Sequence, residues 1–261
     1  MPSFDTLLGD PALFALLALA SFIVGLSKGG LPAVGMLSVP LLSLIMSPLV
    51  AAVLLLPIFV LSDLVGVYLY RKEYSRENLK VLIPAGILGV LVGWGTAAYV
   101  TAAMVSLLIG IMGIVFCLHR WFGGWLSGAE AGTRHHKEPT QPSTAKGLFW
   151  GTLSGFTSFV SHAGAPPFQV YVLPQQLPKM VFAGTTTILF AIVNLAKVIP
   201  YWSLHPYTLS TLKVSAVLLP LAAVGTVIGR QLIRQLSEKW FYLAVQIALF
   251  MISIRLVMAA F

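Results

Sequence analysis

Residues 156–174 read FTSFVSHAGAPPFQVYVLP, a polar, proline-containing stretch set between long apolar runs. It contains His162, Gly164 and the adjacent prolines Pro166 and Pro167. Proline removes a backbone donor and glycine allows non-helical φ angles, so an unbroken helix does not fit this stretch. Because proline suits the first turn of a helix, the stretch predicts one helix that ends near His162 and another that begins at the prolines.

The chain around this stretch is apolar enough to predict that its solvent is lipid. Of 261 residues, 58% are hydrophobic and 9% are charged, and the mean hydropathy is +0.92. Soluble domains carry about a quarter charged residues, and a chain of this length cannot bury so much apolar surface in a core. A helix pairs its backbone groups internally, as lipid requires. The composition therefore predicts an all-α polytopic membrane protein.

The remaining composition argues against other classes of protein. The net charge is +8, but the basic residues gather in loops, where they set membrane topology, so we expect no nucleic-acid partner. The single cysteine, Cys117, excludes an internal disulfide. His135 and His136 lie in a polar linker, where neighbouring histidines are usually solvated. We therefore expect no metal and no cofactor.

The apolar runs, separated by proline, glycine and charge, predict about eight to ten membrane segments. A full crossing needs about 20 residues, so segments 33–46 and 165–174 are too short to cross upright. We expect them to be half-helices or re-entrant arms. The ten segments are roughly 11–27, 33–46, 49–70, 79–98, 102–120, 147–160, 165–174, 179–201, 209–230 and 238–260.

The loop charges predict the orientation of the segments. Loops 71–80, 121–146 and 230–239 carry Lys and Arg, whereas 99–102 and 202–208 carry neither. Cytoplasmic loops are enriched in basic residues, so the first three loops are predicted to be cytoplasmic and the other two external. Following the chain outward from these loops places both termini on the external side.

The two halves of the chain align with each other, which indicates an internal duplication. Residues 25–40, GLSKGGLPAVGMLSVP, overlap 161–174, SHAGAPPFQVYVLP, when Pro40 is placed on Pro174. The further pairs are Ser27 with Ser161, Lys28 with His162, Gly30 with Gly164, Pro32 with Pro166, Asp63 with Asn194, and Tyr70 with Tyr201.

Each half holds an odd number of crossings, so the second copy must be inverted in the membrane. The loop charges agree, because 71–80 is basic and its counterpart 202–208 is not. We therefore predict two inverted-topology repeats, residues 1–120 and 147–261, joined by a cytoplasmic linker at 121–146. In such folds the broken helices meet near the midplane, where substrates bind.

The two helix interruptions predict an anion site. A helix that begins at a proline after a glycine directs free N–H groups and a partial positive charge at the interruption. Lys28 and His162 add polar heads at equivalent positions. A purely structural kink is the competing interpretation. The candidate substrate-binding residues are Lys28, His162, Ser27, Gly29, Gly30, Ser161, Gly164, Pro166, Gln169, Thr185, Thr186 and Asn194.

Three further polar features in apolar segments have open interpretations. Asp63 either neutralises Lys28, carries a coupling proton, or lies near the inner end of its helix. The threonines at 185–187 either face the interruption or bond back to their own helix. Lys197 lies close to Pro200, so we expect it to extend to the external boundary.

Four glycines have the small-xxx-small spacing that lets two membrane helices approach closely. We expect them to lie at helix contacts. They are Gly89, Gly93, Gly225 and Gly229.

Residues 25–40, 155–175 and 182–201, the last reading FAGTTTILFAIVNLAKVIPY, resemble the twin motifs of the TauE/SafE sulfite exporter family. The resemblance extends from about residue 12 to 258. It implies a multi-pass protein of the bacterial inner membrane, with about eight spans; on the loop charges, both termini are then expected to be periplasmic. It also implies a carrier of sulfite, sulfoacetate, other small organosulfonates or related anions.

The sequence therefore favours a secondary transporter, specifically an exporter of a small anion, rather than an enzyme. No nucleotide-binding motif is present, so a gradient would supply the energy, through a coupling proton or cation. A homo-oligomer is compatible with the sequence. The alternatives are a passive anion channel and an intramembrane hydrolase that pairs His162 with Ser154, Ser158 or Ser161.

Overall fold

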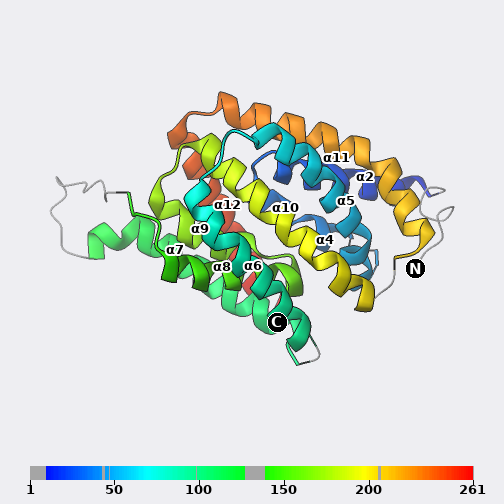
Figure 1. Ribbon diagram of the computed structural model, residues 1–261, viewed down its shortest axis with the longest axis horizontal. Coiled ribbons are helices and arrows are strands. Elements are labelled where there is room, and N and C mark those ends of the chain that lie inside the picture. Colours follow the sequence, from blue (N-terminus) through cyan, green and yellow to red (C-terminus); the bar gives the residue numbers. More distant parts are fainter. Residues whose placement is uncertain are drawn as a thin grey trace.

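The computed structural model describes residues 10–42, 45–46, 48–97, 99–126, 139–204 and 207–260. In these ranges the chain folds into helices and contains no strand (Figure 1). The elements are α2 (Pro11–Lys28), α3 (Pro32–Gly35), α4 (Ser38–Leu42), α5 (Pro48–Tyr70), α6 (Arg76–Thr96), α7 (Ala102–Leu126), α8 (Thr144–Ser161), α9 (Ala165–Val172), the 3-10 helix η1 (Leu173–Gln175), α10 (Lys179–Leu204), α11 (Leu209–Gln235) and α12 (Glu238–Met258).

Six of the described helices are long and apolar enough to cross a membrane, namely α2, α5, α6, α10, α11 and α12. The apolar part of α7, Ala103–His119, is somewhat shorter. These helices confirm the prediction of an all-α polytopic membrane protein. Helix α7 continues to Leu126 and α8 begins at Thr144. The part of the predicted linker that holds His135 and His136 lies outside the described residues.

Short polar side chains determine where several helices begin. Asp10 accepts hydrogen bonds from the N–H groups of Ala12 and Leu13 at 2.9 and 3.3 Å, and so caps α2. Ser75, Thr208 and Ser237 cap α6, α11 and α12 in the same way. Each cap satisfies a donor that the first helical turn leaves free. The long helices therefore begin where the local sequence supplies an acceptor.

Helices α2 and α8 both end inside the protein, as the sequence predicts. We name residues 29–31 the first break and residues 162–164 the second break. Gly30 has φ of 105° and His162 has φ of 52°, so both breaks use the left-handed region. After the second break α9 has 8 residues, about 12 Å at 1.5 Å per residue. Because the hydrocarbon layer is about 30 Å thick, α9 is a short arm, as predicted.

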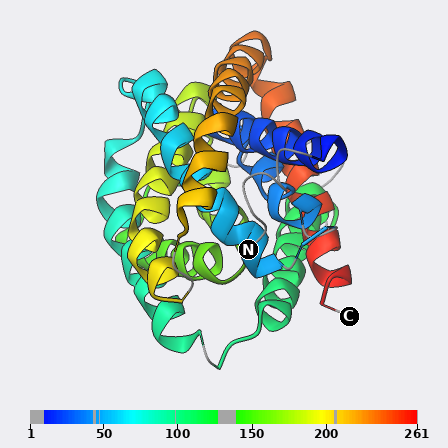
Figure 2. The same ribbon diagram turned by 90° about the vertical axis from the view of Figure 1, so that its right-hand side faces the viewer.

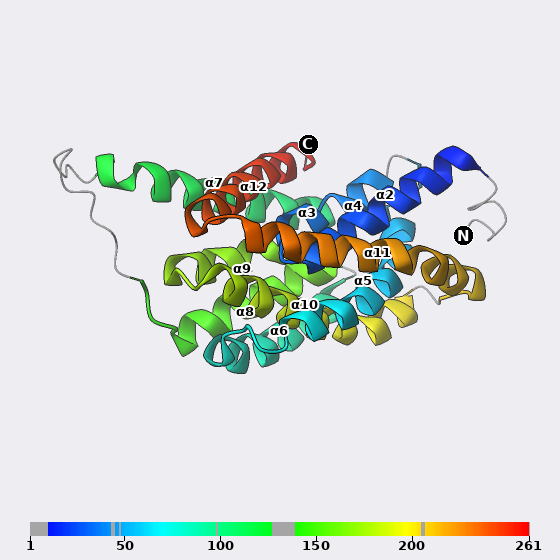
Figure 3. The ribbon, with the colours of Figure 1, turned by 90° about the horizontal axis from the view of Figure 1, so that it is seen from above.

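Each broken helix packs along a helix from the other half of the chain. Helix α2 lies along α11 and α8 lies along α6 (Figures 1 and 3). A Cβ at Gly89 would lie 2.0 Å from the Thr152 carbonyl oxygen, and one at Gly225 would lie 2.5 Å from that of Phe22. The predicted helix contacts at these glycines are therefore confirmed. The pairs α5–α10 and α7–α12 also pack across the two halves (Figure 2).

The basic turns lie at one end of the molecule. The Arg230 guanidinium, in the C-terminal part of α11, is 2.9 Å from the Glu73 carboxylate in the α5–α6 turn. The Lys179 N–H at the start of α10 is 3.0 Å from Glu238 at the start of α12. In Figure 3, α2 and α5 run from right to left, whereas α8 and α10 run from left to right. Inverted copies require these opposite directions, and the repeat relationship itself stays a prediction.

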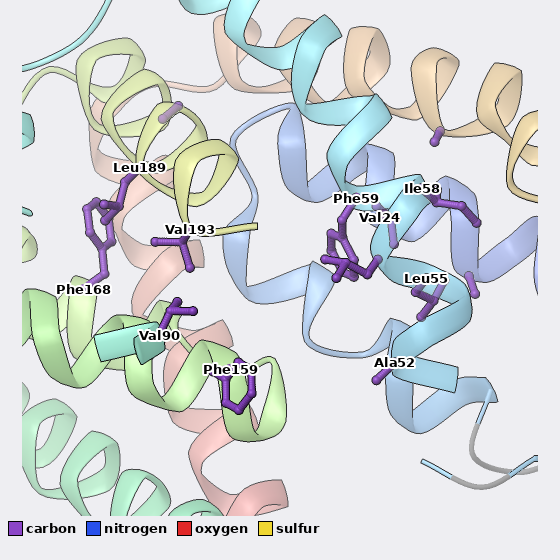
Figure 4. Close-up of a cluster of buried hydrophobic side chains, with 14 of the residues drawn as sticks. Val24, Ala52, Leu55, Ile58, Phe59, Val90, Phe159, Phe168, Leu189 and Val193 are labelled. Carbon is purple, nitrogen blue, oxygen red and sulfur yellow. The ribbon is translucent and has the colours of Figure 1, made fainter. Parts of the chain in front are cut away.

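Buried apolar side chains from helices of both halves belong to one core cluster, part of which is drawn in Figure 4. In lipid, close packing rather than exclusion of water holds helices together, so this cluster fixes the helices that position the breaks. It includes Val24, Ala52, Leu55, Ile58 and Phe59 on α2 and α5, and Val90, Phe159, Phe168, Leu189 and Val193 on α6, α8, α9 and α10.

Candidate functional site

A small cavity with several polar groups in its lining lies between the two breaks, α5 and α10. Its volume is about 50 Å³. Because one water needs about 10–15 Å³ of such space, the cavity admits a few waters or one compact ion. It is lined by Ser27, Lys28, Pro32, Gly35, Met36, Phe59, Ser158, His162, Gly164, Ala165, Thr186, Thr187, Phe190, Asn194 and Lys197.

Lys28, the last residue of α2, is held by an ion pair inside the protein. Its side chain is buried, and Nζ lies 2.7 Å from Oδ1 of Asp63 on α5. The same ammonium lies 4.9 Å from the centre of the Phe59 ring, a cation–π distance. Thr187 on α10 donates to the Lys28 carbonyl oxygen at 3.1 Å, which satisfies part of the helix end. Of the interpretations of Asp63, neutralisation of Lys28 is the one that the contacts support.

Asp63 also joins the two long central helices. Its Oδ2 accepts a hydrogen bond of 2.8 Å from Nδ2 of Asn194 on α10. Both side chains are buried. The alignment of the two halves of the chain pairs these two positions with each other, and the structure places them in direct contact. The carboxylate is therefore fixed from both sides, by an ammonium group and by an amide.

The second break is held by side chains of α8 that lie before it. Ser154 donates to the Gly164 carbonyl oxygen at 2.7 Å, and Thr157 donates to that of Ala163 at 3.0 Å. The N–H groups of Gly164 and Ala165 have no acceptor among the described residues. Both residues line the cavity, so the N-terminal end of α9 presents unpaired donors to it.

Lys197 is a cavity residue that sequence reasoning placed wrongly. It was expected to extend to the external boundary, but its side chain is completely buried. Its Nζ lies 3.2 Å from both the carbonyl oxygen and Oγ of Ser158, and 3.4 Å from Nδ1 of His162. Helical spacing could have indicated that Lys197 faces the cavity. Asn194, Lys197 and Tyr201 recur at intervals of three and four and so share one face of α10.

The His162 ring is positioned on both of its nitrogens. Nδ1 faces Lys197, and Nε2 lies 3.1 Å from the Tyr201 hydroxyl oxygen. Phe59 stacks on the ring, with centroids 5.6 Å apart and planes at 15°. Tyr201 donates onward to the Phe159 carbonyl oxygen at 2.9 Å. Its sequence counterpart Tyr70 donates to the Gly29 carbonyl oxygen at 2.5 Å, so each break is held by one tyrosine.

Half of the candidate residues from the sequence line the cavity, namely Ser27, Lys28, His162, Gly164, Thr186 and Asn194. The structure places the other half elsewhere. The Gly30 N–H donates to the Ser27 carbonyl oxygen, and the Ser161 hydroxyl donates to that of Thr157. Thr185 points toward the basic turn, where it accepts from the Ser75 N–H at 2.8 Å. The remaining three, Gly29, Pro166 and Gln169, are buried outside the cavity lining.

The contacts of the serines bear on the hydrolase alternative. Ser154 donates to the Gly164 carbonyl oxygen and Ser161 to that of Thr157, while Ser158 accepts from Lys197. Among the described residues, none of the three bonds to His162, as a nucleophile–base pair requires. The same part of the chain holds no group of three His, Cys, Asp or Glu side chains suited to a metal ion.

Comparison with known proteins gives one family. The family model described as "Sulfite exporter TauE/SafE" matches residues 17–256. Comparisons with curated proteins and with solved structures give no match. The matched range includes both breaks and every residue that lines the cavity.

Proposed function

Because the chain belongs to the TauE/SafE sulfite exporter family, we propose that it is a secondary transporter that exports sulfite, an organosulfonate or a similar small oxyanion. The family consists of membrane transporters, and the six long apolar helices agree with a multi-pass protein. The proposed location is the bacterial inner membrane, with the basic turns in the cytoplasm and both termini in the periplasm.

One observation carries this proposal: the cavity gathers cationic and donor groups where two helices are broken. Lys28 and Lys197 supply ammonium groups, and Gly164 and Ala165 supply unpaired N–H groups. Oxyanions bind to such donors, particularly at the N-terminal end of a helix. Charged side chains are expensive inside a membrane protein and usually mark the path of a substrate.

Transport would require the cavity to open to each side in turn. The two halves meet at the basic end through polar contacts, including the pair between Asn78 on α6 and Gln175 in η1, at 2.8 Å. We propose that these contacts separate when one half moves against the other, as in carriers built from inverted repeats. The energy would come from an ion gradient, through a coupling proton or cation.

Efflux from proteoliposomes tests the proposal. Vesicles loaded with radiolabelled sulfite should lose it faster when they contain the wild-type protein than when they contain none. Lys28→Gln keeps a donor toward Asp63 but removes the charge, so we expect efflux to fall at least about tenfold, the factor that 1.4 kcal/mol of lost interaction produces. Lys72→Gln, in the exposed α5–α6 turn, is the matched control and should leave efflux unchanged.

Two results would contradict the proposal. If vesicles with the wild-type protein release neither sulfite nor an organosulfonate faster than protein-free vesicles, the protein is not the proposed exporter. A folded Lys28→Gln protein with normal efflux would show that the cavity between the breaks is not the anion site. Folding of each variant is checked by size-exclusion chromatography in detergent.

A further inference from the structure

Lys197 has the surroundings of a charged ammonium group. A protonated amine donates three hydrogen bonds. Three acceptors lie near Nζ: the Ser158 carbonyl oxygen and Oγ at 3.2 Å, and His162 Nδ1 at 3.4 Å. The first of these lies in the last turn of α8, where the helix dipole also favours a cation.

His162 is neutral in this arrangement. Its Nδ1 lies 3.4 Å from Lys197 Nζ, and when Lys197 is protonated Nδ1 is the acceptor of this contact. The Tyr201 hydroxyl donates to the Phe159 carbonyl oxygen at 2.9 Å, so it accepts from Nε2–H at 3.1 Å. The chain of donors therefore runs in one direction, from Lys197 through the imidazole to the backbone. An imidazole with one proton satisfies every contact in this chain.

The charges around the cavity then do not cancel. Lys28 is paired with Asp63 at 2.7 Å. None of the three acceptors around Lys197 is an anion, and among the described residues the only other ion pair joins Arg230 to Glu73 at the basic end. With both lysines protonated, the cavity has two cations and one carboxylate, which leaves one positive charge. Buried charges need a partner, and a bound anion would supply it.

We infer that the cavity selects a compact oxyanion that carries a single negative charge, and that Lys197 balances this charge. The inference rests on the proposed function and narrows it to hydrogen sulfite or a short alkylsulfonate. A dianion would leave one negative charge uncompensated in a medium where charges are weakly screened. A volume of about 50 Å³ also favours a headgroup without a long tail.

Two tetrahedral sulfur oxyanions of different charge test the inference. Methanesulfonate carries one negative charge and sulfate carries two, and both present sulfonyl oxygens of similar geometry. We expect the purified wild-type protein to bind methanesulfonate at least about tenfold more tightly than sulfate in calorimetric titrations at one pH, which corresponds to 1.4 kcal/mol of charge compensation.

Charge variants make the test specific. Asp63→Asn keeps the contact with Asn194 but raises the excess charge to two, so the preference should reverse in favour of sulfate. The charge-matched control, Lys28→Gln combined with Asp63→Asn, returns the excess to one and should restore the preference for methanesulfonate. Lys197→Met should bind neither anion, whereas Lys197→Arg, which keeps the charge, should retain measurable binding.

The outcomes separate this inference from the proposed function. The inference is overturned if the wild type binds sulfate as tightly as methanesulfonate, or if Asp63→Asn does not change the preference. Either result would still be compatible with an anion carrier. Absence of binding to methanesulfonate, sulfate and sulfite in the wild type would instead remove the proposed function. If Lys197→Met does not fold, the inference is tested by the anion preference of the wild type compared with that of Asp63→Asn.

Discussion

Lys28 and Lys197 are both buried beside the cavity, but only Lys28 meets a carboxylate. Lys28 was recognisable from the sequence because it lies deep in an apolar run and next to glycines. Lys197 was not, because Pro200 suggested that the helix ends nearby. Helix α10 instead continues through Pro200 to Leu204, which places Lys197 two turns inside the helix. A membrane helix can continue through a proline when neighbouring helices pack against it. That packing cannot be read from the sequence, so the depth of Lys197 within the helix could not be predicted.

The backbone of His162 allows its ring to be tested separately from its conformation. An L-residue in the left-handed region is strained by roughly 1–2 kcal/mol relative to glycine, and His162 has φ of 52°. His162→Ala removes the ring and keeps the strain, whereas His162→Gly removes both. We expect His162→Gly to be more stable than His162→Ala by about 1 kcal/mol, after the larger entropy of glycine in the unfolded chain is subtracted.

Unfolding of the two variants by denaturant in detergent micelles measures this difference. Both should lose anion binding equally, because both lose the ring. An alanine variant as stable as the glycine variant would show that the second break relaxes when the ring is removed.

At the scale of the elements, most of the helix ends that could be predicted were marked by proline and glycine. The ends of α2 and α8 and the short arm α9 follow from Gly30, Gly164 and the prolines after them. The first arm differs from the second, because α3 has only 4 residues and cannot act as a helix N-terminus of the kind expected there. The left-handed His162 was unpredictable, since residues other than glycine rarely adopt such angles.

The contact between α6 and α8 depends on glycine at one position and not at another. A Cβ at Gly89 would lie 2.0 Å from the Thr152 carbonyl oxygen, whereas one at Gly95 in the same helix would meet nothing within 4 Å. We expect Gly89→Ala to lower the free energy of unfolding by about 1–3 kcal/mol, because backbone must move to admit the methyl group. Gly95→Ala should be neutral or slightly stabilising.

Thermal or denaturant unfolding of the two glycine variants measures the difference directly. Equal stabilities would mean that α6 and α8 separate at little cost, and the helix pair would then not be the rigid support that the second break requires.

For the whole molecule, polar contacts join the two halves at the basic end, and we propose that they close the cavity on that side. Glu73 pairs with Arg230, Ser75 bonds to Thr185, and Asn78 bonds to Gln175. Each of these contacts joins the first half of the chain to the second. The amide pair is buried, so it contributes more than the partly exposed ion pair, for which solvent screening is strong.

Thiol labelling tests whether this end is a gate. Thr186→Cys in a Cys117→Ala background places a single thiol in the cavity lining. Asn78→Ala removes two hydrogen bonds of 2.8 and 3.2 Å to Gln175. Since each buried hydrogen bond contributes about 1 kcal/mol, we expect labelling from the basic side to become at least about tenfold faster. Unchanged labelling would show that the gate lies elsewhere.

The direct contact between Asp63 and Asn194 has a consequence for how the protein arose and can be rebuilt. If the halves are inverted copies, as we propose, these two residues face each other across the axis that relates them. A symmetric assembly of the first half alone would place the two Asp63 carboxylates against each other without the Asn194 amide between them, and one of the second half alone would place amide against amide with neither Lys28 nor Asp63 present. The copies therefore cannot be interchanged, and only the two different half-chains expressed together would reconstitute the anion site.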